Sequence, residues 1–284
     1  MSQVELTLMA AGHCVHPEHA VHRNWRLRAL EFPAMFALIE HPRRGPILFD
    51  TGYAQAFLDA TRAFPGQLYR WVTPVTAEPS DFAVAQLARR GIAADDVELI
   101  IASHFHGDHV AGLGDFPRAK ILYFDAAWRA VAGRRGLGAL RRGFLPELVP
   151  RDFAARAAPI EAQRFAPLPG EFTPFRTGVD LLGDGALWAV MLPGHAAGQL
   201  GLFVRDARRG TVFLCADACW TSRALRDERM PSAVARLLFD DWGAYRATLG
   251  EVAAYQRLHP SLEVVPSHCV EALRRFGVGR GAWN

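Results

Sequence analysis

A chain of 284 residues, half of them hydrophobic, can bury a substantial core and fits one large domain or two small ones. We expect one domain over residues 1–284 and no disorder. The net charge of +3 is small and the arginine pairs are scattered, which argues against nucleic-acid binding. No apolar run reaches the length of a membrane span, and the N-terminus lacks the features of a signal peptide. We therefore expect a cytoplasmic protein that does not bind membranes.

The first predicted strand covers residues 4–9 and leads into a loop rich in histidine. Pro17 interrupts any helix there, and Glu18 is the only carboxylate among the ring nitrogens. The pattern favours an exposed or substrate-facing loop over a second metal site. The residues concerned are His13, Cys14, His16, His19 and His22.

Two further strands are predicted at residues 35–39 and 47–50, joined by a turn containing Pro42, Gly45 and Pro46. The second strand ends in Asp50, for which two interpretations remain open. It is a simple turn residue, or it is a carboxylate that accepts a ring N–H from a metal-bound histidine and fixes its tautomer.

The middle of the chain alternates aromatic, helical and apolar segments. The aromatic stretch at residues 53–78 could serve a homodimer interface, and a helix is expected from about Asp81 to Gly91. Residues 97–102 read as a buried strand, and another strand at 121–124 precedes a short helix. Residues 133–170 are rich in Arg, Gly and Pro, which indicates an insertion acting as a lid or pocket wall, with a plain surface excursion as the alternative.

The last part of the chain is rich in strands. They are expected at residues 187–192, 200–204, 211–215 and 262–265, with helices at about 230–239 and 242–258 before the last one. In each half of the chain, a strand ending in Asp comes before a strand ending in Ser-His. This repetition suggests two similar β-rich halves that meet at a shared site.

The four cysteines are few and irregularly spaced, which favours reduced thiols. Cys215 and Cys219 do not form a Cys-x-x-Cys pair, and their apolar neighbours favour small core residues over a redox pair. The complete set is Cys14, Cys215, Cys219 and Cys269.

The segment from Ser103 to His109 carries the strongest chemical signal. It follows a buried strand and contains His104, His106, Asp108 and His109. Imidazole nitrogen and carboxylate oxygen are ligands of Zn²⁺ and related ions, and the His-x-His pair lies on one side of an extended segment. Since Asp108 and His109 start a helix, the ligands diverge in a way that suits two adjacent metals. The alternative, a loop rich in histidine by chance, does not explain the strand–loop–helix context.

Three more residues directly follow apolar strands, so each can project from a strand end toward the same rim. They are His195 after Gly194, Asp217 after Ala216, and His268 after Ser267. Singly, each would more often be a turn residue than a ligand. Together with the first cluster, they predict one metal centre.

In these motifs the chain resembles the metallo-β-lactamase superfamily of metallohydrolases over nearly its whole length. The resemblance implies a mixed α/β (α+β) fold, an αββα four-layer sandwich with the site at one edge. It also implies that one metal is bound by His104, His106 and His195, the other by Asp108, His109 and His268, with Asp217 bridging them. The cofactors would be two divalent ions, first of all zinc, with iron or manganese as alternatives.

Within the superfamily the chain looks most like the N-acyl homoserine lactonase group. That group commonly has a tyrosine where this chain has Trp220, which is therefore a candidate substrate-binding residue. The resemblance implies a hydrolase that opens a lactone or related carboxyl ester with a metal-bridged hydroxide, and Asp108 as the catalytic proton shuttle.

Several other functions stay open. A thioesterase of the glyoxalase II type or another acyl-ester hydrolase is the main alternative, and a non-catalytic ligand-binding relative is a further one. A phosphodiesterase is disfavoured because no basic cluster is evident near the ligands, and an oxygen-reducing diiron protein because no flavin domain is appended.

Overall fold

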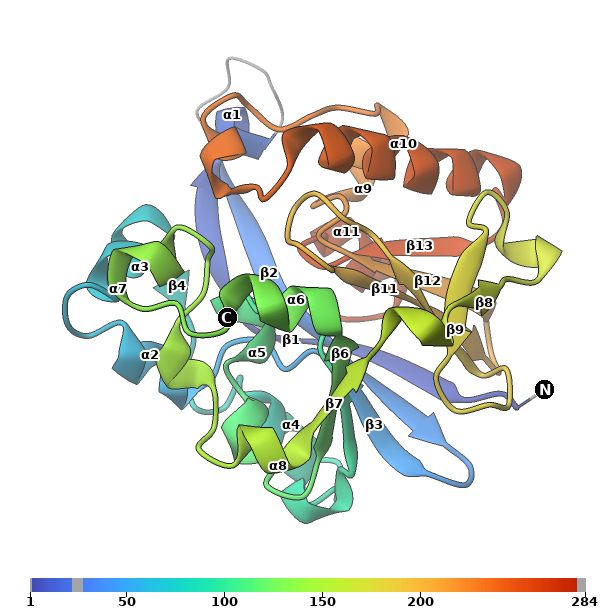
Figure 1. Cartoon of the computed structure of the whole chain (residues 1–284), viewed down its shortest axis with the longest axis horizontal. Helices are drawn as coiled ribbons and strands as arrows, with labels where there is room; N and C mark the ends of the chain where they lie inside the picture. Colours follow the sequence, from blue (N-terminus) through green and yellow to red (C-terminus); the bar gives the residue numbers. More distant parts are fainter. Residues whose placement is uncertain (1, 22–27, 280–284) are drawn as a thin grey trace.

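Two stacked β-sheets form the centre of the computed structural model, which describes residues 2–21 and 28–279 (Figure 1). The strands of the first sheet are, in spatial order, β4 (Val75–Thr76), β1 (Glu5–Pro17), β2 (Ala29–His41), β3 (Gly45–Phe49), β5 (Leu99–Ile101), β6 (Lys120–Phe124) and β7 (Ala157–Ile160). Those of the second are β13 (Glu263–Pro266), β12 (Gly210–Ala216), β11 (Leu200–Asp206), β10 (Leu187–Met191), β9 (Thr177–Asp180) and β8 (Ala166–Pro167).

Alternation along the strands explains why the two sheets stack. Leu6 and Leu8 of β1 belong to the same buried cluster as Val212 and Leu214 of β12, and this cluster fills the space between the sheets. Met9 belongs to a second cluster on the outer face of the first sheet. Because successive side chains of a strand point to opposite faces, both faces of each sheet are apolar and both must be covered.

Helices cover the two outer faces. Seven helices lie in sequence between β3 and β7, two strands of the first sheet: α2 (Gln55–Ala60), α3 (Gln67–Val72), α4 (Ala83–Ala88), α5 (Gly107–Val110), α6 (Asp125–Val131), α7 (Gly136–Leu140) and α8 (Phe153–Arg156). The other helices of the described residues are α1 (Glu18–Val21), α9 (Ser222–Arg226), α10 (Trp242–Leu258) and α11 (Val270–Arg275). Helix α10 packs on the second sheet, where its Leu249 and Val252 join a cluster with Phe203 and Phe213. The predicted αββα sandwich is confirmed.

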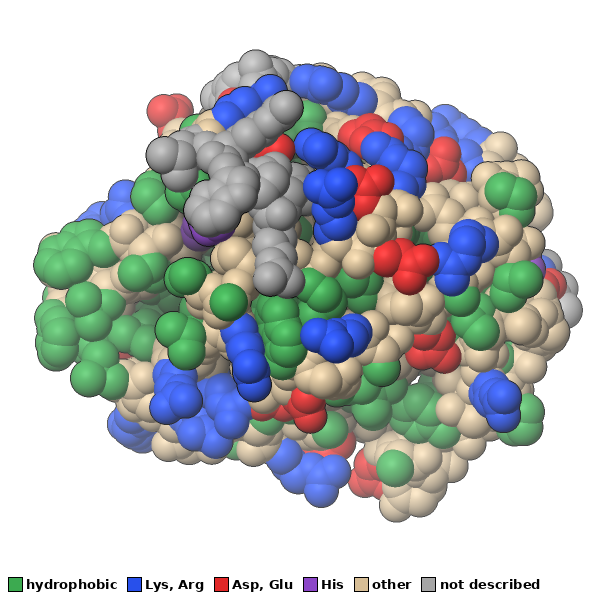
Figure 2. All heavy atoms as spheres, turned by 90° about the horizontal axis from the view of Figure 1, so that it is seen from above, with side chains coloured by type: hydrophobic (Ala, Val, Ile, Leu, Met, Phe, Trp, Pro, Cys, Tyr) green, Lys and Arg blue, Asp and Glu red, His purple; other side chains and the backbone are tan. Residues whose placement is uncertain are grey.

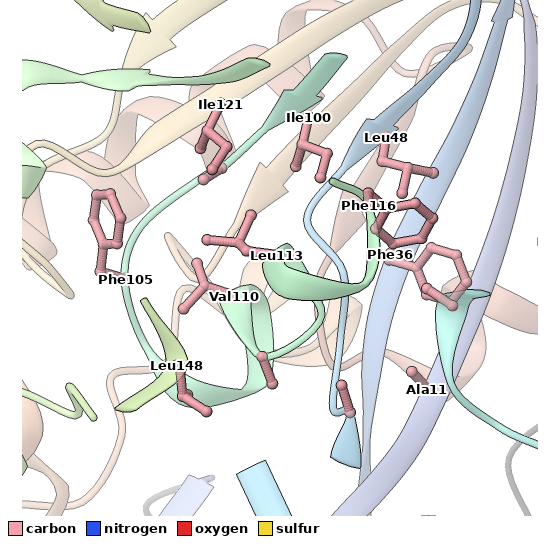
Figure 3. Packing of buried hydrophobic residues seen from close by; sticks show 14 of the residues in the cluster. Ala11, Phe36, Leu48, Ile100, Phe105, Val110, Leu113, Phe116, Ile121 and Leu148 are labelled. Atoms are coloured by element: carbon pink, nitrogen blue, oxygen red, sulfur yellow. The ribbon is translucent and has the colours of Figure 1, made fainter. Parts of the chain in front are cut away.

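The loop that follows β5 rests on the outer-face cluster of the first sheet (Figure 3). Ile100 of β5 and Ile121 of β6 are fully buried, and Val110 of α5 is buried against the same cluster. Leu113 and Phe116, just beyond α5, are also fully buried. These contacts hold the loop and the start of α5 in one position relative to the sheet.

Parallel pairing explains why the polar residues predicted at strand ends gather at one edge. Strand β3 pairs in parallel with β5, and β12 pairs in parallel with β13. The carboxyl ends of parallel neighbours meet at the same edge of a sheet. Asp50 and His104 therefore lie together in one half of the molecule, and Asp217 and His268 in the other.

The structure corrects two of the expected elements. The first strand does not end at residue 9: β1 continues to Pro17, with His13, Cys14 and His16 paired to β2, because Gly12 and a register shift let the strand bend and carry on. Residues 230–239 are not a helix, apart from a short 3-10 turn at Ala235–Leu238, because the chain after them is bound to the loop around His195.

Residues 133–170 contain a strand that the sequence did not predict. Residues 157–160 form β7 and pair in parallel with β6, so this part belongs to the first sheet. Its sequence, Ala-Ala-Pro-Ile, is too short and too interrupted by proline to be recognised as a strand. All four cysteines are buried free thiols, and the burial of Cys215 and Cys219 agrees with their predicted place in the core. Cys14, which was predicted in an exposed or substrate-facing loop, is buried in β1 instead. Within residues 2–21 and 28–279, no helix is both long and apolar enough to cross a membrane.

Candidate metal centre

The predicted ligands gather at the edge where the two sheets meet. His104, His106, Asp108 and His109 come from the β5–α5 loop, and His195 follows β10. Asp217 follows β12, and His268 follows β13. Among the described residues, three groups have ligand atoms within 4.8 Å of one another: His104 with His106 and His195, His104 with His109 and Asp217, and Asp108 with His109 and His268.

Asp217 lies between the outer two of these groups. Its Oδ2 is 3.1 Å from Nε2 of His195, and its Oδ1 is 3.2 Å from Nε2 of His268. On one side, Nε2 of His195 lies 2.9 Å from Nδ1 of His106. On the other, Oδ2 of Asp108 lies 3.4 Å from Nε2 of His268. The arrangement is thus two ligand clusters with one carboxylate reaching both.

Contacts behind the centre orient the rings. Nδ1 of His109 lies 2.8 Å from Oδ2 of Asp50, and Nδ1 of His268 lies 2.9 Å from the carbonyl oxygen of Pro33. Ser103 donates its backbone N–H to Asp50 at 2.7 Å, and its hydroxyl lies 3.0 Å from Nδ1 of His104. In all three rings Nδ1 is engaged on the outer side, which leaves Nε2 to face the centre.

Three of the ligand atoms that point into the centre lack hydrogen-bond partners, as expected of atoms that bind metal ions. Nε2 of His104 and Nε2 of His109 are buried and have no hydrogen-bond partner. Oδ1 of Asp217 makes no hydrogen bond either, since Nε2 of His268, although 3.2 Å away, is hydrogen-bonded to Oδ2. A buried polar atom without a partner costs roughly 1–3 kcal/mol. Divalent cations would supply the missing partners of exactly these nitrogen and oxygen donors, so the residues fit such ions.

Three histidines are held neutral, the form that binds metals. Burial lowers the pKa of His106 to about 4 and that of His195 to about 3, although the carboxylates of Asp108 and Asp217 act in the opposite direction. Burial, reinforced by the charges of His109 and His106, also lowers the pKa of His104 well below its ordinary value. Their ring nitrogens are therefore free of the extra proton at neutral pH.

The other half of the centre is dominated by carboxylates. Burial alone would lower the pKa of His109, but Asp108, Asp50 and Asp217 outweigh it and raise the pKa to about 10. Burial would raise the pKa of Asp217, yet His268, His195 and His109 hold it well below its ordinary value. The carboxylates around His109 would stabilise a bound cation as they stabilise the ring proton, so a divalent ion would displace that proton when it binds.

Two glycines let the chain approach the ligands closely. Gly194, before His195, has φ of 126°, and a Cβ there would lie 2.1 Å from the backbone nitrogen of Tyr245. Gly143 has φ of 61°, and a Cβ there would lie 2.5 Å from the ring of His106. Residues with side chains are excluded at both positions, because the conformation is strained and the space is filled.

Trp220 lies beside the centre and contacts a predicted ligand. Its indole N–H donates to Oδ2 of Asp217 at 3.1 Å, and its ring centroid lies 5.9 Å from that of His195. The same oxygen of Asp217 faces His195. The single N–H of the indole is thus committed to a carboxylate.

The N-terminal histidines are separate from the centre. None of the groups with metal-ligand spacing in the described part of the chain includes His13, His16 or His19, and His22 lies outside the described residues. His16 packs its ring against Phe32 at 5.5 Å, and Phe32 in turn lies 5.9 Å from the ring of His268. These strands therefore flank the centre as a wall.

Sequence reasoning missed three parts of the site. Ser103 was part of the recognised motif, but nothing marked its hydroxyl as the link between Asp50 and His104. The carbonyl of Pro33 has no signal at all, because any residue carries a backbone oxygen. Gly143 lies more than thirty residues beyond the motif in sequence, and only the fold brings it to His106.

Comparison with known proteins gives a consistent picture. The family model described as the metallo-beta-lactamase superfamily matches residues 31–257. The N-acyl homoserine lactonase AttM of Azorhizobium caulinodans is 28% identical over 299 residues, covering 100% of both chains. The N-acyl homoserine lactonase AiiA of Bacillus thuringiensis subsp. kurstaki is 27% identical over 229 residues, covering 80% of this chain and 81% of that one.

Solved structures share the fold. An N-acyl homoserine lactone hydrolase with the product N-hexanoyl-L-homoserine bound at its catalytic metal centre superposes with a TM-score of 0.73 at 22% identity, covering 97% of each chain. The dizinc quorum-quenching lactonase AidC superposes with a TM-score of 0.63 at 14% identity, covering 95% of this chain and 89% of that chain. The matched family model, the four-layer fold and the clustered ligands agree, and the chain belongs to the metallo-β-lactamase superfamily.

Proposed function

We propose that this protein is a metal-dependent hydrolase that opens the ring of a lactone, with N-acyl homoserine lactones as the first candidates. The observation that carries the proposal is the pair of buried ligand clusters joined by Asp217. The curated relatives that match over most of the chain are named N-acyl homoserine lactonases, which supports this substrate class. The four unpaired thiols suit a reducing compartment such as the cytoplasm.

The two clusters suggest how two ions would be held. One would be bound by His104, His106 and His195, and the other by Asp108, His109 and His268. Asp217 would bridge them. The nitrogen and oxygen donors suit zinc, and they also accept iron or manganese. Bound there, divalent cations would lower the pKa of a water molecule and polarise the carbonyl of an ester.

The protein's own groups would then handle the proton. Asp108 is the more accessible of the two central carboxylates, with 14% of its side chain exposed against 4% for Asp217. Its carboxylate is therefore the one that a substrate can reach more easily. We assign it the role of carrying a proton to the alkoxide that leaves when the ester bond breaks.

Two residues would act through the ligands. Asp50 holds the ring of His109 and is placed to fix its tautomer. Trp220 was expected to bind the substrate, but its N–H donates to Asp217. We therefore assign Trp220 the role of positioning the bridging carboxylate, with its ring forming part of the substrate wall.

Ring opening of an N-acyl homoserine lactone by the zinc-reconstituted protein tests the proposal, followed as acid release at constant pH. We expect turnover that is lost in His106→Ala and kept in the matched control His259→Ala, whose ring lies at the end of α10. Asp108→Asn should lower turnover roughly 100-fold or more with unchanged thermal stability, and the exposed Asp95→Asn should change neither.

A thioester or another acyl ester is the alternative substrate. It is favoured by the indole of Trp220, which cannot exchange a proton at the substrate carbonyl as a phenol can. No opening of any lactone, with two metal ions bound per chain and rapid cleavage of an acyl thioester, would replace the lactonase proposal with this alternative.

A further inference from the structure

An arginine-lined cleft opens beside the metal centre. It has a volume of about 550 Å³ and is lined by the side chains of Arg134, Arg141, Arg142 and Arg236, together with Gly138, Ala233, Leu237, Phe239 and Asp240. The arginines come from two segments that are far apart in sequence, one around α7 and one just before α10. Only the tertiary structure brings them together, which is why no basic cluster near the ligands was evident from the sequence.

The charge of the cleft is largely uncompensated. Asp240 is its only carboxylate, and it forms an ion pair with Arg142. Four arginines against one aspartate leave a formal charge of +3 within the lining. Within the described residues, no ion pair is recorded for Arg141 or Arg236. A concave surface with this excess of guanidinium groups attracts an anion, because guanidinium binds carboxylate and phosphate through paired hydrogen bonds.

The cleft adjoins the candidate metal centre. A narrower cavity shares Arg141, Arg142 and Asp240 with it, and this cavity is also lined by His106 and His195. This narrower cavity has a volume of only about 20 Å³, so the arginines and the two predicted ligands line neighbouring hollows that share one wall.

Both walls of the cleft are tied to ligand loops. Arg142 precedes Gly143, whose carbonyl accepts the backbone N–H of Gly107 at 3.2 Å, next to His106. The backbone N–H of Asp240 donates to the carbonyl of His195 at 3.1 Å. The position of the guanidinium groups relative to the metal centre is thus set by the same loops that hold the ligands.

Apolar side chains stand beside the arginines. Leu237, which lines the cleft, is 74% exposed, and Leu137 of α7 is 60% exposed. On the face shown in Figure 2, Lys and Arg side chains gather at the lower left beside exposed hydrophobic ones. This mixture suits a ligand with an apolar chain that ends in a charged group.

From these observations we propose that the cleft selects substrates with an anionic group on the part of the molecule distant from the reacting carbonyl. The group is a carboxylate or a phosphate, seated on Arg141 and Arg236, while the carbonyl lies at the metal centre. The inference rests on the proposed hydrolase function and adds the substrate class to it.

Three lactones with the same alkyl side chain test the proposal, ending in a carboxylate, a phosphate or a neutral methyl ester. We expect kcat/KM to be about tenfold higher for an anionic tail than for the ester, and the advantage to fall as salt is raised. Whichever anionic tail gives the higher value identifies the group. Arg141→Gln and Arg236→Gln should abolish the advantage, because they lower kcat/KM for the two anionic lactones far more than for the neutral one.

Arg135→Gln is the matched control, because Arg135 is exposed on the same segment and does not line the cleft. Equal kcat/KM for all three lactones, or an equal loss in Arg135→Gln, would overturn the proposal while the lactonase function stands. If no lactone is opened, binding of the corresponding lactams by calorimetry decides instead. Tighter binding of the anionic lactams that Arg141→Gln weakens supports the proposal, and equal binding of all three rejects it.

Discussion

Asp50 lies behind the candidate metal centre and is held there by several contacts. Its carboxylate accepts the backbone N–H and hydroxyl of Ser103 and lies 2.8 Å from the ring of His109. The residue has φ of 58°, in the left-handed region that is uncommon outside glycine. A backbone conformation of this kind costs roughly 1–3 kcal/mol, and it directs the carboxylate to both partners.

Replacing Asp50 by Asn should weaken metal binding. The amide can still fill the space, but it offers only one acceptor oxygen and no charge to His109. We expect metal affinity to fall roughly 10–100-fold, the range typical for groups that orient metal ligands. Competition with a chromogenic chelator measures it, and an unchanged affinity would show that Asp50 is a simple turn residue.

Gly143→Ala tests how closely the wall of the site approaches His106. The new Cβ would lie 2.5 Å from the imidazole, so the ring must move and we expect loss of metal from the cluster of His104, His106 and His195. Gly133→Ala is the control, since Gly133 has a similar φ of 73° with nothing within 4 Å. Both variants should lose about 1 kcal/mol of stability from backbone strain, but only Gly143→Ala should lose metal content. Equal metal content in both would refute this reading.

At the scale of elements, parallel strand pairs bring the predicted ligands to one edge, and short helices fix the loops that carry them. The loop carrying four ligands ends in α5, which is only four residues long and has little stability of its own. The position of α5 therefore depends on contacts with other elements. Arg156 of α8 is 6% exposed and donates to the carbonyl oxygens of Leu113, Phe116 and Ala119, in the segment that follows α5.

Arg156→Met should therefore destabilise the fold. The methionine retains the apolar stem but leaves three backbone carbonyls without their donor, and we expect the free energy of unfolding to drop by roughly 3 kcal/mol. Urea unfolding measures the change, with the exposed Arg151→Met as control. A loss no larger than that of the control would mean that water replaces the guanidinium.

At the scale of the whole molecule, the candidate metal centre lies where the two sheets meet, and its predicted ligands come from both. Metal removal should consequently lower the stability of the entire fold. At free zinc a thousandfold above the dissociation constant, binding contributes about 4 kcal/mol. Thermal unfolding before and after chelation tests this, with zinc added back to restore the transition. Identical midpoints with and without bound metal would show that the sandwich holds the ligands without help.

The homodimer expected from residues 53–78 stays a prediction. Within that stretch, Phe64, Trp71 and Val72 expose 66–70% of their surface, which supplies apolar area for an interface. Light scattering of the purified protein would measure its mass in solution. The assignment of residues 133–170 to a lid or pocket wall is likewise a proposal, supported where Arg134, Arg141 and Arg142 line the cleft.

The amino-acid sequence by itself determined the cluster of predicted metal ligands and the stacking of sheets and helices in layers. Alternating apolar residues specify strands with two buried faces, and a cluster such as His104, His106, Asp108 and His109 is recognisable because neighbours in sequence are neighbours in space. Helix α10 was found nearly to the residue, since it is long and starts at the capping Asp241. The bend that carries β1 on to Pro17 was missed, because it depends on pairing with β2.

The tertiary structure alone decided what distant segments do together. Ser103 and the carbonyl of Pro33 became part of the centre, and the hydrogen bond from Trp220 to Asp217 gave the indole a partner. The cleft has the same origin, since Arg141 and Arg236 are nearly a hundred residues apart. Such contacts depend on how packed sheets orient their loops, and no periodicity along the chain records that orientation.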